Sequence, residues 1–285
     1  MPDSLPHAAD GSMLVLYADD LLAVVSKPAG LMVHASPMAR EEDDFLVDRL
    51  RRQFGREVML VHRLDRATSG CVLVTFDRET AAALGEQFMQ RQVDKRYLAV
   101  CRGWPDEQGV IDHPLDGGPG KPLKKPAQTA WRRLATGELP EPSAGFPTSR
   151  YAFLECVPQT GRWRQIRRHL KHAFHHLIGD TSHGDGHHNR IFRARGVERM
   201  LLHAQTLAFS HPRDGRHVRV SAPVDAAFAR ALAMFGWCLP GSADGAVLQP
   251  ASNACPNPHA AIAHSAIVAS EVSAKPGPRV AGSRT

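Results

Sequence analysis

The sequence predicts an α+β protein with a mixed, mostly antiparallel sheet flanked by helices. Strand-sized apolar runs and stretches of helical periodicity do not alternate strictly, which argues against a doubly wound parallel sheet. Several apolar runs are also joined by turn sequences, such as HPRDG at 211–215, and such turns connect antiparallel neighbours. We expect one domain over 13–239, a disordered leader at 1–12 and a disordered tail at 240–285.

Each element is expected from its own pattern. Short apolar runs bounded by turn residues predict strands within 13–35 and at 59–62, 70–76, 95–101, 151–157, 201–209 and 217–221. Apolar residues that recur every three or four positions predict helices at 43–54, 77–91, 164–174 and 224–235. Asp43 or Asp44 is the expected cap of the first helix. The Pro/Gly-rich stretch 102–150 is expected to be a long connection, and the Gly-, His- and Asp-rich stretch 175–200 a loop.

Composition places few limits on function but excludes some classes. Of 285 residues, 43% are hydrophobic and 22% charged, which is ordinary for a soluble globular enzyme. We find no signal-peptide pattern and no apolar stretch long enough to cross a bilayer, so we expect a cytoplasmic protein without membrane contact. Five scattered cysteines without paired spacing argue against a disulfide framework or a four-cysteine zinc site.

Positive charge is concentrated in one segment. The formal net charge of +6 is only weak evidence for a polyanionic partner. The segment 161–171 (GRWRQIRRHLK), however, places five cations around Trp163. A second cluster in the loop 121–125 (KPLKK) is as consistent with a solvated surface as with a binding site.

A candidate reactive carboxylate lies in the polar loop 61–70 (VHRLDRATSG), between two predicted strands. Asp65 stands between Arg63 and Arg66, and neighbouring cations favour an ionised carboxylate that can act as a nucleophile or base. From the charge pattern alone, a salt-bridged turn is the preferred interpretation.

This loop resembles a known family. HRLDRATSG matches in full the HRLD-x-x-TSG signature of the RluA-type pseudouridine synthases. Three further segments are similar to family motifs in the family's order: KRYLAV at 95–100, TGRWRQIRRHL at 160–170, and LHA at 202–204 with FSHP at 209–212. The resemblance implies the pseudouridine synthase fold, an active site in a central cleft, and isomerisation of uridine in RNA without cofactor or metal.

Within the family, the chain resembles the TruC branch, the tRNA pseudouridine-65 synthases. The similarity lies in RGW at 102–104, GDTSHGD at 179–185 with NR at 189–190, and FGW at 235–237. We therefore expect uridine 65 of tRNA as the target, with 23S rRNA as the alternative. Two departures are the absence of an S4 RNA-binding domain before residue 13 and Trp163-Arg164 where many relatives have Thr-His.

The resemblance also implies roles for individual residues. Asp65 would be the catalytic carboxylate, Tyr97 would lie against the base, and Arg167 would pair with Asp65. Arg63 would hold the flipped state by reaching into the RNA, and Ile166 would wall the pocket. Further RNA-binding candidates are Arg66, Arg162, Arg164, Arg168 and Lys171. RNA is the expected partner, and no obligate protein partner is evident.

Two alternatives use other features. Seven histidines lie between 169 and 188, and with Asp180 and Asp185 they could indicate a metallohydrolase. No HExxH or HxHxDH pattern accompanies them, so we expect no metal. A non-catalytic RNA-binding protein is the second alternative, although a pure binder has no need of Asp65.

Overall fold

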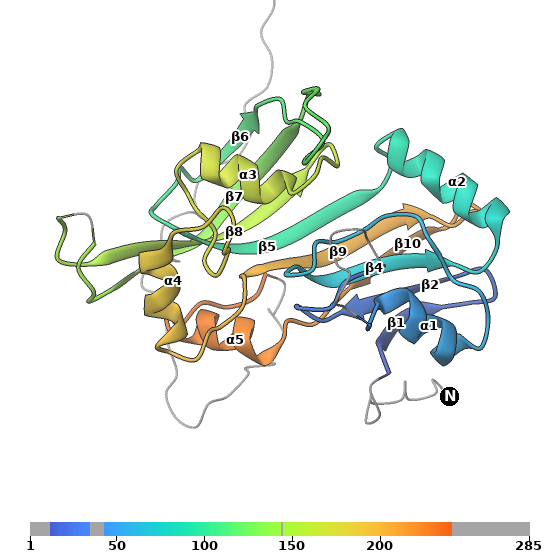
Figure 1. The fold of residues 1–285 in the computed structure, drawn as a ribbon, viewed down its shortest axis with the longest axis horizontal. Coiled ribbons are helices and arrows are strands. Elements are labelled where there is room, and N and C mark those ends of the chain that lie inside the picture. Colours follow the sequence, from blue (N-terminus) through green and yellow to red (C-terminus); the bar gives the residue numbers. More distant parts are fainter. Residues whose placement is uncertain (1–11, 35–42, 144, 241–285) are drawn as a thin grey trace, which may run out of the picture. The chain divides into compact units, whose positions relative to one another are not determined.

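The computed structural model describes residues 12–34, 43–143 and 145–240, and all structural statements refer to them. These residues form one ten-stranded sheet and five helices (Figure 1). The strands are β1 (Leu14–Ala18), β2 (Leu22–Lys27), β3 (Met59–Leu60), β4 (Ser69–Thr75), β5 (Asp94–Arg102), β6 (Gln108–Asp112), β7 (Gln128–Leu139), β8 (Ser149–Pro158), β9 (Leu202–Ser210) and β10 (His217–Ser221). The helices are α1 (Leu46–Phe54), α2 (Arg78–Met89), α3 (Gln165–His172), α4 (Gly186–Arg193) and α5 (Ala226–Ala233).

The sheet is mixed and mostly antiparallel, which confirms the predicted α+β class. Its order is β1-β2-β4-β9-β5-β8-β7-β6, with β10 paired to β9 and β3 paired to β4. Among the described strand pairs only β4 and β9 run parallel, through Ser69 opposite His203 and Gly70 opposite Ala204. This parallel contact lies directly after the predicted catalytic loop and joins it to the centre of the sheet.

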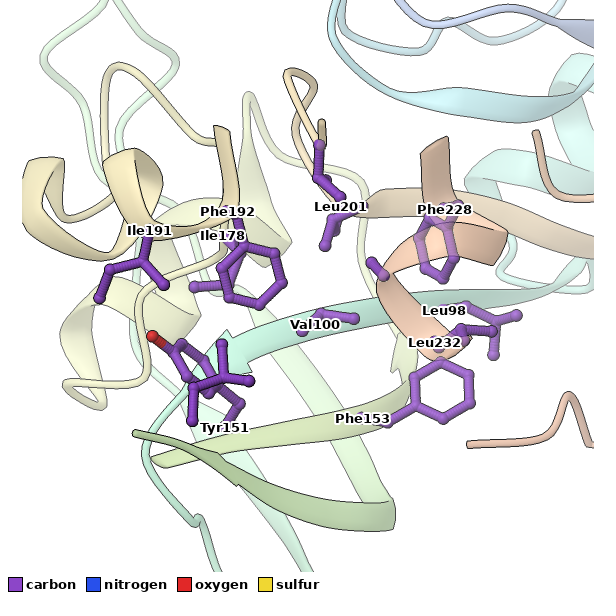
Figure 2. Close-up of a cluster of buried hydrophobic side chains, with 13 residues drawn as sticks. Leu98, Val100, Tyr151, Phe153, Ile178, Ile191, Phe192, Leu201, Phe228 and Leu232 are labelled. Carbon is purple, nitrogen blue, oxygen red and sulfur yellow. The ribbon is translucent and has the colours of Figure 1, made fainter. Parts of the chain in front are cut away.

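Helices cover both faces of the central strands because side chains alternate along a strand. Leu98 and Val100 of β5 face a buried cluster that includes Phe192 of α4 and Phe228 of α5 (Figure 2). The intervening residues of β5 and β8 face a second cluster, which contains Ile166 and Leu170 of α3. The same strands therefore support a structural core on one face and the predicted basic helix on the other.

The sequence prediction was wrong at one helix cap and in two segments. The N-cap of α1 is Phe45, without a side-chain cap bond, and Asp44 instead pairs with Arg49. The stretch expected as a connection contains β6 and β7, whose many exposed and polar residues give no apolar run. The expected loop at 175–200 contains α4, which begins where Asp185 accepts a hydrogen bond from the His187 backbone N–H at 2.9 Å.

Three further expectations concern the chain ends, membrane contact and the cysteines. All of the predicted leader 1–12 except Ser12, and all of the predicted tail 240–285 except Pro240, lie outside the described residues, so the disorder of both segments remains a prediction. None of the described helices is both long enough and apolar enough to span a membrane. Within the described chain, Cys71, Cys101, Cys156 and Cys238 are free thiols.

Gly70 is required where β4 and β9 approach. Its φ is +110°, and a Cβ built there would lie 2.2 Å from the carbonyl oxygen of Ala204. A side chain at this position would combine an unfavourable backbone conformation with a collision against backbone that cannot rotate away.

We predict that Gly70→Ala lowers the free energy of unfolding by roughly 3–5 kcal/mol, because strain and overlap add at one site. Gly85→Ala is the matched control, since Gly85 lies in α2 with open space around its Cβ position. The control should stay within about 1 kcal/mol of the original protein or be more stable. Urea unfolding measures both, and equal midpoints for the two variants would contradict the close β4–β9 contact.

Candidate active site

A cleft of about 720 Å³ opens beside the loop that precedes β4. Its walls come from this loop, from α2 and the start of β5, and from the segment 158–167 that leads into α3. Seven of the ten predicted site residues line it: Arg63, Asp65, Tyr97, Arg162, Arg164, Ile166 and Arg167. The fold thus brings together segments that are far apart in the sequence.

The buried side chain of Lys27 stabilises the turn that carries Asp65. The backbone N–H of Thr68 donates to the Asp65 carbonyl at 3.0 Å, which closes the turn. Lys27 is fully buried, and its Nζ donates to the carbonyls of Arg66, Pro28 and Leu31 at 3.1, 2.8 and 2.7 Å. Burial and Arg199 lower the pKa of Lys27 to about 7, whereas Asp65 opposes this shift. Three carbonyl acceptors require three N–H donors, so this arrangement uses the charged ammonium form.

Arg167 joins two carboxylates. Its Nη1 donates to Oδ2 of Asp65 at 2.8 Å, while Nε and Nη2 donate to the two oxygens of Asp180 at 2.7 and 2.8 Å. The exposed fractions of these side chains are 6% for Arg167, 0% for Asp180 and 23% for Asp65. The guanidinium is therefore fixed by the buried partner and presents one N–H to the partner that reaches the cleft.

Asp180 is itself anchored. Its Oδ1 accepts from the backbone N–H groups of Ser182 and His183, both at 2.9 Å. Burial by itself would raise the pKa of Asp180, but Arg167 and these backbone donors outweigh it and lower the pKa. Asn189 of α4 donates to the Asp180 carbonyl at 3.0 Å and braces the loop. The sequence analysis considered Asp180 only as part of the metallohydrolase alternative and gave it no role beside Arg167, although the GDTSHGD segment marked its location.

Tyr97 is half-buried on β5 and points into the cleft. Burial first, and then the negative charge of Asp65, raise the pKa of its hydroxyl. The phenol therefore stays protonated at neutral pH, and its ring is available as an apolar contact surface.

Among the other residues that line the cleft, His62 and Lys95 were given no site role by the sequence analysis. His62 Nε2 accepts the Leu73 backbone N–H at 2.9 Å, and its ring stacks on Phe88 with centroids 4.9 Å apart. Burial and the charge of Lys95 lower the pKa of His62 to about 3, so the ring is a neutral wall. Lys95 shares a strand face with Tyr97 because the two are separated by one residue.

Three predicted RNA-binding residues do not line the cleft. Arg66 donates from Nε to the Gly30 carbonyl at 3.0 Å, and Arg168 pairs with Asp116 at 2.7 Å. Lys171 is exposed on α3. RNA contact by these three residues remains a prediction.

The histidine-rich stretch serves structural contacts. His169 contacts Thr129 at 2.8 Å. His188 contacts the hydroxyl of Tyr151, which is labelled in Figure 2, at 2.9 Å. His187 donates from Nε2 to the Pro142 carbonyl at 3.0 Å. Within the described part of the chain, no three His, Cys, Asp or Glu side chains are arranged to hold a metal ion. The metallohydrolase reading therefore gains no support from the positions of these histidines.

The sheet and the carboxylate cleft define an α+β enzyme, and comparison with known proteins specifies its family. The family model described as RNA pseudouridylate synthase matches residues 21–172. Over 233 residues the chain is 39% identical to tRNA pseudouridine synthase C of Vibrio cholerae, covering 78% of this chain and 96% of that protein. Over 235 residues it is 41% identical to the protein of the same name from Pasteurella multocida, covering 79% and 97%. The chain belongs to the RNA pseudouridylate synthase family.

Solved structures agree on the fold. Human RNA Pseudouridylate Synthase Domain Containing 1 has a TM-score of 0.58 and 27% identity, covering 80% of this chain and 90% of that one. Human RNA Pseudouridylate Synthase Domain Containing 4 has a TM-score of 0.60 at 24% identity, covering 77% and 91%, and shares the fold. The predicted family and fold are thereby confirmed, and the class of the enzyme is an isomerase.

We predict that Asp180→Asn lowers turnover roughly 10- to 100-fold, because a small displacement of Arg167 misplaces Asp65. It should also lower the free energy of unfolding at pH 7 by about 3 kcal/mol, since a buried ion pair loses one partner. The folded-state pKa of Asp180 lies below its unfolded value. This stabilisation is therefore present above about pH 4 and is lost as the pH falls through the folded-state value.

Urea unfolding between pH 7 and pH 3, together with initial rates at pH 7, measures both effects. Asp48→Asn is the control, since it alters an Asp–Arg pair on the surface of α1 in which each side chain is 45% exposed. The control should change the free energy of unfolding by less than about 1 kcal/mol. A stability difference for Asp180→Asn that persists undiminished at pH 3 would contradict the buried-charge explanation.

Proposed function

We propose that this protein is a tRNA pseudouridine synthase that isomerises uridine 65, with Asp65 as its catalytic carboxylate. The observation that carries the proposal is the contact between Asp65, in its HRLD loop, and Arg167 at the floor of the cleft. The tRNA substrate is supported by the names of the relatives, which align over nearly their whole length. The expected location is the cytoplasm, and the proposal requires no protein partner.

The reaction rearranges one nucleotide. The bond from ribose C1′ to uracil N1 breaks, the base turns, and a bond from C1′ to C5 forms. N1 gains a proton and C5 loses one, so the product has the formula of the substrate and no oxidant or second substrate is consumed. A carboxylate can start this sequence by attacking the sugar or the base, or by taking a sugar proton.

The cleft suits a flipped uridine. The target atoms are inaccessible in stacked RNA, so the nucleotide must leave the stack and enter a pocket. A volume of about 720 Å³ lies within the usual range for ligand sites. Arg63 is exposed and lines the cleft, which supports the proposal that it reaches into the RNA from which the base has left.

The remaining residues position the reacting groups. Tyr97 lies against the uracil ring and, because its hydroxyl is protonated, can donate a hydrogen bond to the base. Arg167 orients the Asp65 oxygen and balances its charge. Ile166, buried and lining the cleft, supplies an apolar wall.

We predict that the purified protein forms pseudouridine at position 65 of unmodified tRNA transcripts without added metal, and that Asp65→Asn does not. Carbodiimide-dependent primer extension maps the product, with 23S rRNA fragments tested in parallel. Pseudouridine only in rRNA would keep the chemistry and overturn the tRNA assignment. Absence from both RNAs, and no missing pseudouridine in the RNA of a deletion strain, would favour a binding protein.

We predict that Arg167→Ala lowers turnover roughly 100-fold or more, with RNA affinity changed by less than about threefold, because its partner is Asp65 and not a phosphate. Single-turnover rates and equilibrium tRNA binding separate the two effects. The variant leaves Asp180 buried without its partner, so Arg167→Ala combined with Asp180→Asn provides a second form without that unpaired charge. Loss of affinity with unchanged turnover in both forms would contradict the ion-pair role.

A further inference from the structure

Arg164 adopts a backbone conformation that is unusual for a residue with a side chain. It is the N-cap of α3, with φ 50° and ψ 36° in the left-handed region. Such conformations are disfavoured for residues other than glycine, and they persist where the surroundings hold them, often at functional sites. Here the conformation accompanies a side chain that lines the cleft, with the Arg164 Cζ 4.4 Å from the centroid of the Trp163 ring.

Arg164 differs from the other arginines of its segment in lacking a polar partner. Arg162 donates to the Pro126 carbonyl, Arg167 pairs with two carboxylates, and Arg168 pairs with the partly buried Asp116. Among the described residues, no hydrogen bond or ion pair is made by the Arg164 side chain. The guanidinium has an aromatic ring against one side, while its N–H groups are left for a ligand.

The surroundings of Arg164 also disfavour its positive charge when no anionic ligand is bound. Burial and then the positive charge of Arg167 lower the pKa of Arg164, and the carboxylates of Asp65 and Asp180 only partly oppose them. A guanidinium nevertheless remains protonated at neutral pH. The cleft therefore contains a half-buried positive charge that is exposed to the repulsion of a second cation, Arg167.

Trp163, on which Arg164 rests, is itself fixed. A Cβ built on Gly118 would lie 2.8 Å from Trp163 Cδ2, so the loop backbone packs directly against the indole. The ring of His183 meets the indole edge-on, with centroids 6.3 Å apart. The indole is thus held before any ligand binds, which limits the entropy lost when Arg164 engages one.

We propose that Arg164, seated on Trp163, binds a backbone phosphate of the RNA immediately beside the flipped uridine. The proposal rests on the proposed function for its RNA substrate. A phosphodiester is the favoured ligand because the planar guanidinium donates two parallel hydrogen bonds to phosphate oxygens. One face of the guanidinium is already covered by the indole, so its free N–H edge is the group that remains for recognition.

The test compares tRNA binding and turnover for Arg164→Gln, Arg164→Lys and Trp163→Leu over a series of salt concentrations. Arg164→Gln should weaken binding roughly tenfold. Its slope of log affinity against log salt should be smaller in magnitude by about 0.7–0.9, as expected for one lost phosphate contact. The loss should be larger in the RNA concentration needed for half-maximal turnover than in turnover at saturating RNA. Arg164→Lys should keep the slope, and Trp163→Leu should fall between.

A matched control removes the same charge elsewhere. Arg193→Gln alters an exposed arginine of α4 that does not line the cleft, and it should change affinity less than about twofold. A methylphosphonate at either linkage flanking the target uridine locates the contact. At one of these linkages it should weaken binding by the original protein but not by Arg164→Gln.

Two results would overturn the site. Equal losses for Arg164→Gln and Arg164→Lys with an unchanged salt slope would mean that the guanidinium stacks on a base. Absence of coupling at both flanking linkages would also exclude the proposed phosphate. If the original protein binds tRNA with the Arg164-dependent slope but forms no pseudouridine, the proposed function fails and the phosphate site stands.

Discussion

The pairing of Arg167 with two carboxylates of unequal exposure is the constraint on which the site depends. A buried charge is tolerated only when it is paired and hydrogen-bonded. Asp180, fully buried, takes two N–H groups of the guanidinium, while Asp65, partly exposed, takes one. Arg167 is thus held by two hydrogen bonds to the structural residue Asp180, and it makes one hydrogen bond to Asp65, the proposed reactive residue. Asp65 is held in place without being enclosed.

The sheet delivers the other half of this geometry. Because β4 and β9 meet in parallel at Gly70, the turn that carries Asp65 is fixed against the strand beside β5, and β5 presents Tyr97 to the same cleft. Lys27 secures the turn from the neighbouring strand through the Arg66 carbonyl. The hydrogen-bonded strands β4, β9 and β5 therefore set the relative positions of the Asp65 carboxylate and the Tyr97 ring. Helix α3 adds the Arg167 guanidinium from one face of the sheet.

Sequence reasoning succeeded where a local pattern determines the outcome and failed where a tertiary partner does. The strands around the HRLD motif and the helix at α3 were predictable from apolar runs and a basic periodic segment. The role of Asp180 was not predictable from the sequence, because it depends on an ion pair with Arg167, which lies thirteen residues away in another element. Helix α4 was missed because its apolar residues Ile191 and Phe192 are adjacent and do not recur at helical spacing, although both are buried in the core. Strand β7 was missed because its many exposed and polar residues give no apolar run.

Charge density alone could not have shown which arginines face the substrate. In the sequence, the segment 161–171 is one uniformly basic stretch. In the structure, its arginines differ in the groups with which they interact. Arg168 forms a partly buried ion pair with Asp116, Arg167 belongs to the buried network, and Arg164 has a left-handed backbone and lines the cleft. A cation that already has a carboxylate gains little from a phosphate, because binding would exchange one ion pair for another. The unpaired arginine is therefore where RNA binding should gain most, and this distinction requires the fold.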